Sequence, residues 1–148
     1  MLQQPKNRKY RKDRKNFIKI NNKGIPTAAK AHTLQYGCYG LKALECCLLK
    51  ATHIESVRRV LIRDLRKIGN IWIRIFPSKP ITSKPLKTRM GKGKGSVQYW
   101  AAPVKAGQIL FEISGSVSNV FAQQILLKAS QKLPIKAKFI GYNTANTY

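Results

Sequence analysis

Acidic residues are scarce in this sequence. Among its 148 residues, 5 Asp and Glu stand against 29 Lys and Arg, which gives a formal net charge of +24. A metal-dependent nuclease needs clustered carboxylates to hold its ions, and acid–base catalysis needs carboxylates or histidines placed around a substrate. Because the acids are scattered along the chain, we predict that the protein is not an enzyme. They are Asp13, Glu45, Glu55, Asp64 and Glu112.

Cysteine and histidine are also few, with 3 and 2 residues respectively. Cys38, Cys46 and Cys47 form no Cys-x-x-Cys pair, and His32 and His53 are too far apart for a histidine zinc motif. We therefore predict no metal site. The cysteines are interpreted as small buried hydrophobic residues of a protein in a reducing compartment.

Long hydrophobic runs are missing as well. None approaches the roughly 20 residues that span a membrane, and residues 1–20 lack the apolar stretch of a signal peptide. A basic protein lying on an anionic membrane surface would need a free apolar helix face. The strongest apolar helical stripe, within residues 54–68, is expected in the core, so we predict no membrane partner.

Nucleotide-binding fingerprints are absent too. Gly95 is followed by Ser96 rather than by lysine, so the glycine-rich segment before it is not a P-loop. No glycines have the Gly-x-Gly-x-x-Gly spacing between a strand and a helix. We predict that the protein binds no cofactor.

The excess of positive charge is the main feature that the sequence does contain. Self-repulsion opposes the compact state, and the usual reason for such an imbalance is a polyanionic partner, most often nucleic acid. A hydrophobic content of 43% is ordinary for a folded protein. The competing hypothesis, a nucleic-acid-processing enzyme, would depend on Glu112 or Asp64.

Residues 1–30 form a basic N-terminal tail. Apolar residues are sparse there, so we expect this segment to be disordered when free and to bind RNA through its charges. A merely solvated tail is the alternative. The candidate RNA-binding residues of the tail are Lys6, Arg8, Lys9, Arg11, Lys12, Arg14 and Lys15.

A first helix is predicted after Thr52. Thr52 and Glu55 fit a capping box, and Gly69 fits the residue that follows a helix. Apolar residues then recur at helical spacing. They are Ile54, Val57, Leu61, Leu65 and Ile68.

The opposite face of this helix is basic. We expect Arg58, Arg59 and Arg63 to contact phosphates, with a solvated charged face as the alternative. Asp64 lies at helical spacing from arginines, which favours an ion pair within the helix.

Residues 77–95 are predicted to form a long basic loop. Three prolines break regular structure, and a loop of this length in a compact domain is usually functional or disordered. Glycines alternate with lysines, which would let the backbone approach an anionic partner closely. The candidate RNA-binding residues of this loop are Lys84, Lys87, Arg89, Gly91, Lys92, Gly93, Lys94 and Gly95.

The remaining pattern predicts an α+β fold, with two helices packed on an antiparallel or mixed sheet. We expect one or two strands in 31–49, a strand at 71–76, a hairpin of 96–104 and 108–114, and a last strand at 135–140. Ser118 is expected to cap a second helix that ends near Lys132, with a buried stripe of Ala122, Ile125, Leu126 and Ala129. The predicted organisation is a tail (1–30), a single domain (31–141) and a short C-terminal tail (142–148).

Several motifs in order resemble the bacterial-type family of large-subunit ribosomal protein L-sixteen. They are the opening at 1–6, the helix residues 54–59, the segments 71–77 and 79–85, the glycine loop at 89–95, Tyr99 with Trp100, and residues 133–136. Residues 23–50 match that family poorly.

The resemblance implies a structural constituent of the large ribosomal subunit. Its partners would be large-subunit rRNA near the peptidyl-transferase centre, tRNA in the aminoacyl site and neighbouring ribosomal proteins. Arg89 and residues 92–95 would lie in the loop that reaches toward tRNA.

The compartment is a separate expectation. The family's own start coincides with Met1, and abundant Lys, Ile and Asn suggest an AT-rich genome. We expect a mitochondrial ribosome, with a plastid ribosome and the bacterial cytoplasm as alternatives.

Overall fold

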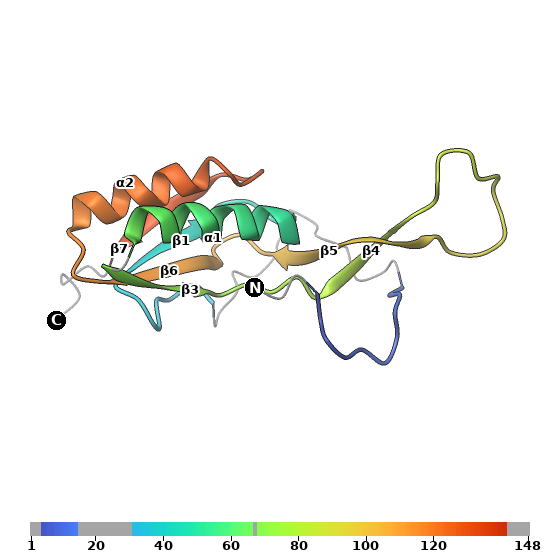
Figure 1. Cartoon of the computed structure of the whole chain (residues 1–148), viewed down its shortest axis with the longest axis horizontal. Coiled ribbons are helices and arrows are strands. Elements are labelled where there is room, and N and C mark those ends of the chain that lie inside the picture. Colours follow the sequence, from blue (N-terminus) through green and yellow to red (C-terminus); the bar gives the residue numbers. More distant parts are fainter. Residues whose placement is uncertain (1–3, 15–30, 67, 142–148) are drawn as a thin grey trace.

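Runs of strands, rather than a strict alternation of strands and helices, make up the described part of the chain, as expected of an α+β fold (Figure 1). The computed structural model describes residues 4–14, 31–66 and 68–141. Its elements are β1 (Tyr39–Ala43), β2 (Cys47–Lys50), α1 (Ala51–Leu65), β3 (Gly69–Ile73), β4 (Lys79–Ser83), β5 (Ser96–Val104), β6 (Ile109–Gly115), α2 (Asn119–Ser130) and β7 (Ala137–Gly141).

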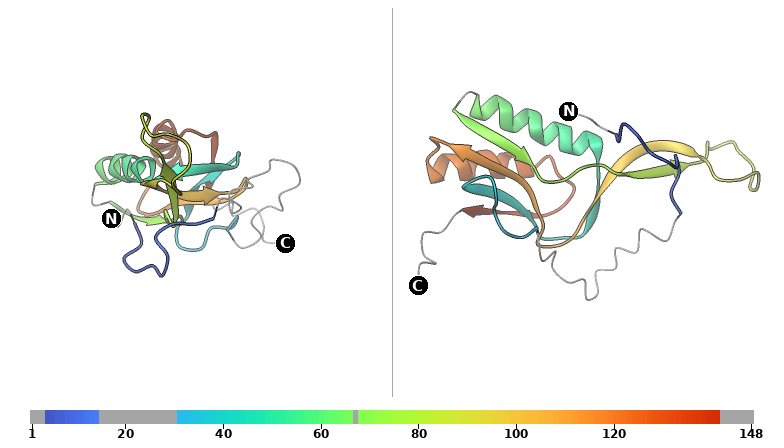
Figure 2. Two further views of the ribbon diagram at one scale, coloured as in Figure 1. Left: turned by 90° about the vertical axis from the view of Figure 1, so that its right-hand side faces the viewer. Right: turned by 90° about the horizontal axis from the view of Figure 1, so that it is seen from below.

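The strands form two sheets. A four-stranded sheet has the order β3-β6-β1-β7, and a three-stranded sheet has the order β2-β5-β4. Every strand pairing in the described ranges is antiparallel. Both helices lie on one side of the four-stranded sheet (Figures 1 and 2). The predicted fold class, two helices on antiparallel sheets, is confirmed.

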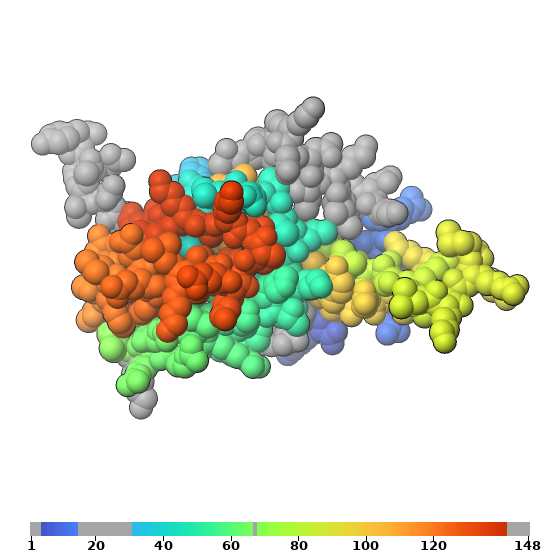
Figure 3. Space-filling model, turned by 90° about the horizontal axis from the view of Figure 1, so that it is seen from above, coloured from blue at the N-terminus to red at the C-terminus, as the bar shows by residue number. Residues whose placement is uncertain are grey.

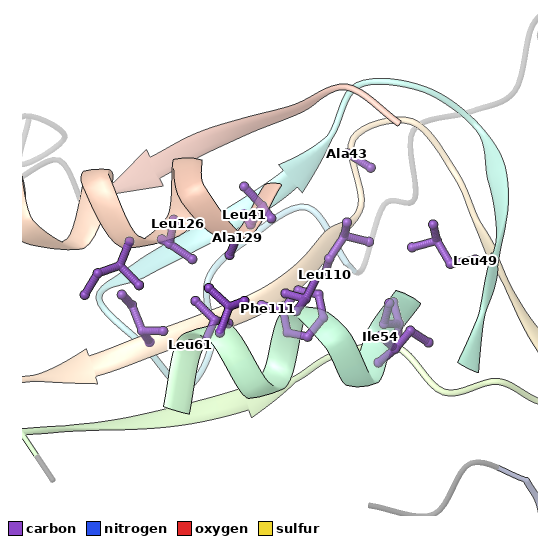
Figure 4. Close-up of a cluster of buried hydrophobic side chains, with 14 of the residues drawn as sticks. Leu41, Ala43, Leu49, Ile54, Leu61, Leu110, Phe111, Leu126 and Ala129 are labelled. Carbon is purple, nitrogen blue, oxygen red and sulfur yellow. The ribbon is translucent and has the colours of Figure 1, made fainter. Parts of the chain in front are cut away.

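The hydrophobic core lies between the helices and the four-stranded sheet (Figure 4). Leu41 and Phe111 project from the sheet, and Leu61 and Leu126 come from the two helices; all four are fully buried. Burying a large apolar side chain contributes about 1.5–3 kcal/mol relative to leaving it exposed. This core fixes the sheet on which the functional surfaces are built.

The start of α1 differs from the prediction. Four residues of the predicted stripe, from Ile54 to Leu65, are buried as expected. The N-cap is Lys50 rather than Thr52, and no side chain caps the helix. The reason is that β2 pairs with β5 as far as Lys50, so the helix begins directly at the strand end. The predicted capping box is therefore wrong.

The end of α1 is also earlier than predicted. The helix stops at Leu65, and Arg66 takes a positive φ of 49° as the C-cap. Gly69 belongs to β3 instead of following the helix, and Ile68 is 53% exposed rather than part of the buried stripe. Pairing of Gly69 with Gly115 on β6 explains why the chain leaves the helix before this point.

α2 follows the prediction closely. The Ser118 side chain accepts a hydrogen bond from the Phe121 N–H at 3.4 Å, and the predicted apolar stripe is buried. The helix ends at Ser130, two residues before the predicted end near Lys132. A local cap and a local stripe were enough to define this element.

The predicted hairpin of 96–104 and 108–114 is wrong. Both strands exist, as β5 and β6, but they do not pair with each other. β5 lies between β2 and β4, whereas β6 lies between β3 and β1. The turn between them carries the chain from one sheet to the other.

The predicted loop of residues 77–95 contains a strand. β4 occupies Lys79–Ser83 and pairs with β5, with Pro80 opposite Trp100. Proline is tolerated because β4 is an edge strand, where its missing N–H faces no neighbour. The loop proper is thereby shortened to residues 84–95.

None of the helices in the described ranges has the length and apolar character of a membrane span. All three cysteines are free; Cys38 is exposed and Cys46 and Cys47 are partly exposed, so the prediction that they are buried is wrong.

Candidate nucleic-acid interface

β4 and β5 form a two-stranded ribbon that projects from the body of the protein and carries residues 84–95 at its tip. Figure 1 shows that the ribbon extends away from the two helices, and Figure 3 shows that the loop projects beyond the body of the protein. The loop carries five basic residues and no acid. A long, exposed and acid-free projection suits contact with a polyanion.

The glycines of this loop have two different structural reasons. Gly91 and Gly93 have φ of 90° and 84°, in the region that favours glycine, and an added Cβ would meet no atom within 4 Å. Gly95 has no positive φ; an added Cβ there would collide with the Ser83 carbonyl oxygen. Thus Gly95 lets β4 and β5 approach each other at the end of the ribbon. The need for glycine at this position comes from packing within the protein and not from a partner.

The N-terminal tail docks on this ribbon. Lys12 Nζ donates to the Lys94 carbonyl oxygen at 2.9 Å, and Lys94 Nζ donates in turn to the Asp13 carbonyl oxygen. These residues are more than 80 positions apart in the chain. Two of the three predicted basic segments are therefore joined, and we call residues 4–14 and 84–95 together the tail–loop face.

Asp13 is the acid that anchors the tail. Its Oδ1 accepts from Arg8 at 2.5 Å, and its Oδ2 lies 3.8 Å from Lys79 Nζ. The hydrogen bond from Arg8 lowers the pKa of Asp13, and the positive charges of Arg8, Lys79 and Lys94 add to this against the opposing effect of burial. The single acid of the tail thus compensates charge inside the tail–loop face.

A hollow of about 450 Å³ opens beside Asp13. Arg14, Lys79, Lys84 and Lys94 contribute to its wall, together with the outer surface of β4. Four cations around one partly neutralised carboxylate leave this hollow positively charged, which suits an anionic group such as a phosphate.

Two aromatic residues of β5, next to the tail–loop face, contact cations. The Arg8 guanidinium carbon lies 5.4 Å from the centroid of the Trp100 ring, and Lys50 Nζ lies 4.7 Å from that of Tyr99. Such cation–π contacts hold the charged groups in place over β5.

The basic residues of the loop differ in what they contact. Lys84 Nζ donates to the Gly91 carbonyl oxygen at 2.7 Å, which braces the loop. Among the described residues, the side chains of Lys87, Arg89 and Lys92 make no hydrogen bond or ion pair and are exposed. These three charges are therefore available to a partner.

The predicted basic residues of the tail also fall into classes. Lys6, Lys9 and Arg11 are exposed, and Lys9 lies over the ring of Tyr10. Arg8 and Lys12 hold the tail to the ribbon, as described above. Lys15 lies outside the described residues.

Among the described residues, the arginines of α1 make no hydrogen bond or ion pair with the tail–loop face and form a separate surface. Arg58 donates two hydrogen bonds to Glu55, at 2.8 and 2.6 Å, and Arg59 donates one at 3.1 Å. The hydrogen bond from Arg58 is the main cause that lowers the pKa of Glu55 to about 2, and the pair raises the pKa of Arg58. These two predicted phosphate contacts are therefore partly neutralised within the helix.

Asp64 pairs mainly across the helices rather than within one. Its Oδ2 lies 2.8 Å from Lys128 Nζ on α2, whereas Arg63 of α1 is 3.6 Å from Oδ1. The prediction of an ion pair confined to α1 missed the closer partner, because it depends on how α2 packs. The Arg63 side chain stays 71% exposed.

Known proteins resemble this chain over nearly its whole length. A family model described as "Ribosomal protein L16p/L10e" matches residues 5–140. The chain belongs to this family. It is 47% identical over 137 residues to the proteins named "Large ribosomal subunit protein uL16" from Coxiella burnetii strains RSA 331 / Henzerling II and Dugway 5J108-111, covering 93% of this chain and 95% of each relative.

Membership of the L16p/L10e family confirms the resemblance found in the sequence motifs. The family is one of ribosomal proteins, in agreement with the prediction that the chain is not an enzyme. In the described ranges of this L16p/L10e protein, no group of three His, Cys, Asp or Glu could hold a metal ion.

Two structural roles in this L16p/L10e protein were missed by sequence reasoning. In the sequence, Asp13 counts only as one of five scattered acids, although its position alone among cations is itself a signal that it compensates charge. Glu112, another of these scattered acids, is fully buried and paired with Arg74. An acid within an apolar strand signals such a buried partner, because an unpaired buried charge is costly.

Proposed function

We propose that this chain is a structural constituent of the large ribosomal subunit and that its tail–loop face binds rRNA near the peptidyl-transferase centre. The observation that carries the proposal is the docking of the tail on the ribbon through Lys12, Asp13 and Lys94, which gathers two basic segments into one projecting face. Relatives that are 47% identical to it over 137 residues are named large ribosomal subunit proteins, which supports the same assignment.

Within this proposal, the tip of the loop helps to form the aminoacyl-tRNA site. Lys87, Arg89 and Lys92 are its exposed cations, and Gly91 and Gly93 keep the backbone open to close approach. Arg58, Arg59 and Arg63 of α1 would make a second, weaker set of rRNA contacts, because Glu55 and Asp64 offset part of their charge. Neighbouring ribosomal proteins complete the set of proposed partners.

The test of RNA binding uses the salt dependence of affinity. Each neutralised phosphate contributes about 0.7–0.9 log units of affinity per log unit of salt. Replacing Arg89 and Lys92, two of the exposed cations of the loop, by alanine should reduce this slope by roughly two such contributions for a large-subunit rRNA fragment. The matched control, Lys132→Ala with Lys136→Ala, removes the same charge outside the tail–loop face and should change the slope less.

Assembly into the subunit is tested separately. The wild-type chain should co-sediment with large subunits in moderate salt, and crosslinks should form from residues 84–95 to rRNA or tRNA. Chain found free of ribosomes and without such crosslinks would contradict the proposed function.

We further propose a mitochondrial ribosome as the site of action, with the plastid ribosome and the bacterial cytoplasm as the alternatives. The lysine-, isoleucine- and asparagine-rich composition supports an organelle genome, whereas the relatives compared above are bacterial. Fractionation of the source cells, followed by detection of the chain in purified ribosomes of each compartment, decides among the three.

A further inference from the structure

Residues 34–37 form a strap across the four-stranded sheet, on the side opposite to the helices, where the cyan segment before β1 runs in Figure 1. Two glycines let the strap lie flat. An added Cβ on Gly40 of β1 would come within 2.6 Å of Leu34, and one on Gly37 would come within 2.6 Å of the Ile113 carbonyl oxygen. The strap therefore contacts the sheet backbone directly.

A buried carboxylate fixes the strap. Glu112 Oε2 accepts from the backbone N–H groups of Gln35, Tyr36 and Gly37 at 3.2, 2.7 and 2.9 Å. Its other oxygen accepts from Arg74, whose second nitrogen donates to the Gln35 side-chain oxygen at 2.9 Å. Since all three backbone donors converge on one atom, the position of Tyr36 is set by the sheet rather than by its own side chain.

Tyr36 presents an aromatic surface at this point. Its ring stacks on Trp72 of β3, with centroids 6.4 Å apart and planes 18° from parallel, and the Arg74 guanidinium carbon lies 5.2 Å from the Tyr36 centroid. Yet Tyr36 remains 59% exposed. A residue that served only to cover the sheet would be expected to bury its ring, because exposed aromatic surface forfeits the stabilisation of burial.

We propose that Tyr36, Trp72 and Arg74 form a stacking platform for an unpaired RNA base. Proteins bind single-stranded RNA by stacking bases on aromatic rings and on arginine guanidinium planes, and here both groups lie together beside the four-stranded sheet. The acid within the cluster, Glu112, is already neutralised by Arg74, so it does not repel a phosphate backbone. The proposal rests on the proposed function only in that the chain binds RNA; the platform itself is separate from the tail–loop face.

The experiment uses the fluorescence of Trp72. The chain has two tryptophans, so Trp100→Phe leaves Trp72 as the sole reporter. The full-length Trp100→Phe protein is titrated with a single-stranded oligoadenylate of about eight nucleotides. We expect quenching of Trp72 on binding, because a base stacked on Tyr36 changes the surroundings of the adjoining indole.

Substitutions at Tyr36 then measure the platform. Tyr36→Leu should weaken oligoadenylate binding by about 5- to 150-fold, the value of one stacked base, and leave the salt slope unchanged because no charge is lost. Tyr36→Phe should bind like the parent protein. Phe121→Leu, which alters a 38% exposed aromatic residue on α2, is the matched control and should bind normally.

The outcomes separate the platform from the proposed function. Salt-dependent binding without Trp72 quenching, and with equal affinity in Tyr36→Leu, would overturn the platform and leave RNA binding by the tail–loop face intact. Absence of RNA binding by the wild-type chain, in which Trp100 is unchanged, would overturn both. Because the quenching measurement needs no change at Tyr36, it decides the question even if Tyr36→Leu does not fold.

Discussion

Glu112 and Arg74 form an ion pair in which the carboxylate is fully buried and the arginine side chain is 12% exposed. Burial on its own would raise the pKa of Glu112. Hydrogen bonds from the N–H groups of Tyr36, Gly37 and Gln35 and from Arg74 outweigh it and lower that pKa below its ordinary value. The acid is thus kept charged inside the protein, where it joins β6 to the strap and to Arg74, the residue that follows β3.

Replacing Glu112 by alanine should destabilise the protein strongly. Arg74, whose side chain is 12% exposed, and three backbone N–H groups would lose their acceptor, and removing one partner of a buried pair costs about 3–5 kcal/mol. Urea denaturation measures the change in the free energy of unfolding. Glu45→Ala, at an exposed position, should stay within about 0.5 kcal/mol of wild type. Equal effects of the two substitutions would contradict a structural role for the buried pair.

Replacing Asp13 by asparagine should loosen the tail. The variant loses the charge that pairs with Arg8 and Lys79 but keeps the carbonyl oxygen that Lys94 uses. Ion pairs near the surface contribute roughly 0–1 kcal/mol each, so the loss of two pairs should make the amide hydrogens of residues 8–13 exchange up to about 30-fold faster.

The control for Asp13 is Glu45→Gln, which makes the same change in net charge at an exposed position. Its tail amides should exchange at the wild-type rate. If both variants exchange alike, then Asp13 does not anchor the tail.

The glycines of the loop should respond differently to alanine. Gly95→Ala places a Cβ against the Ser83 carbonyl oxygen at the end of the ribbon, and overpacking of this kind costs about 1–3 kcal/mol. In Gly91→Ala the added Cβ meets no atom within 4 Å, so the only cost is the strain of an alanine at a positive φ. Thermal unfolding should show a larger loss for Gly95→Ala; a larger loss for Gly91→Ala would argue against close packing at residue 95.

The ion pairs of Glu55 should give a stability difference that depends on pH. The pKa of Glu55 is lowered from 4.5 to about 2, so its contribution is fully present above pH 4.5 and is lost as the pH falls toward 2. Glu55→Gln should therefore be less stable than wild type at pH 6, with a gap that closes near pH 2. Urea denaturation at both values measures the gap, and a gap that is constant with pH would show that the charge of Glu55 is not what stabilises α1.

Local signals predicted the parts of the fold that depend on neighbouring residues. Ser118 and the stripe ending at Ala129 defined α2, because a cap and a helical face are set within a few turns. The start of α1 was wrong for the opposite reason, since strand pairing of Lys50 with Ala101 overrides the capping preference of Thr52. β5 was recognised as a strand, but its partners lie far away in sequence.

The candidate site shows the same division. That Lys87, Arg89 and Lys92 keep their charge available to a partner could be predicted from composition alone. A basic segment without acids has no carboxylate of its own to neutralise that charge. That Lys12 meets Lys94 could not be predicted, because the contact depends on the register of β4 and β5 and on the path of the tail.

The sequence by itself determined that this protein is basic, α+β and a member of its ribosomal family, because charge, periodicity and ordered motifs are properties of the chain. Tertiary structure decided which charges remain available and which are already paired. Asp13 and Glu112, two of only five acids, hold the tail and the strap in place through contacts with residues far away in sequence. Such contacts form only once the sheets have set their register, since hydrogen bonds and ion pairs act over a few ångströms and not along the chain.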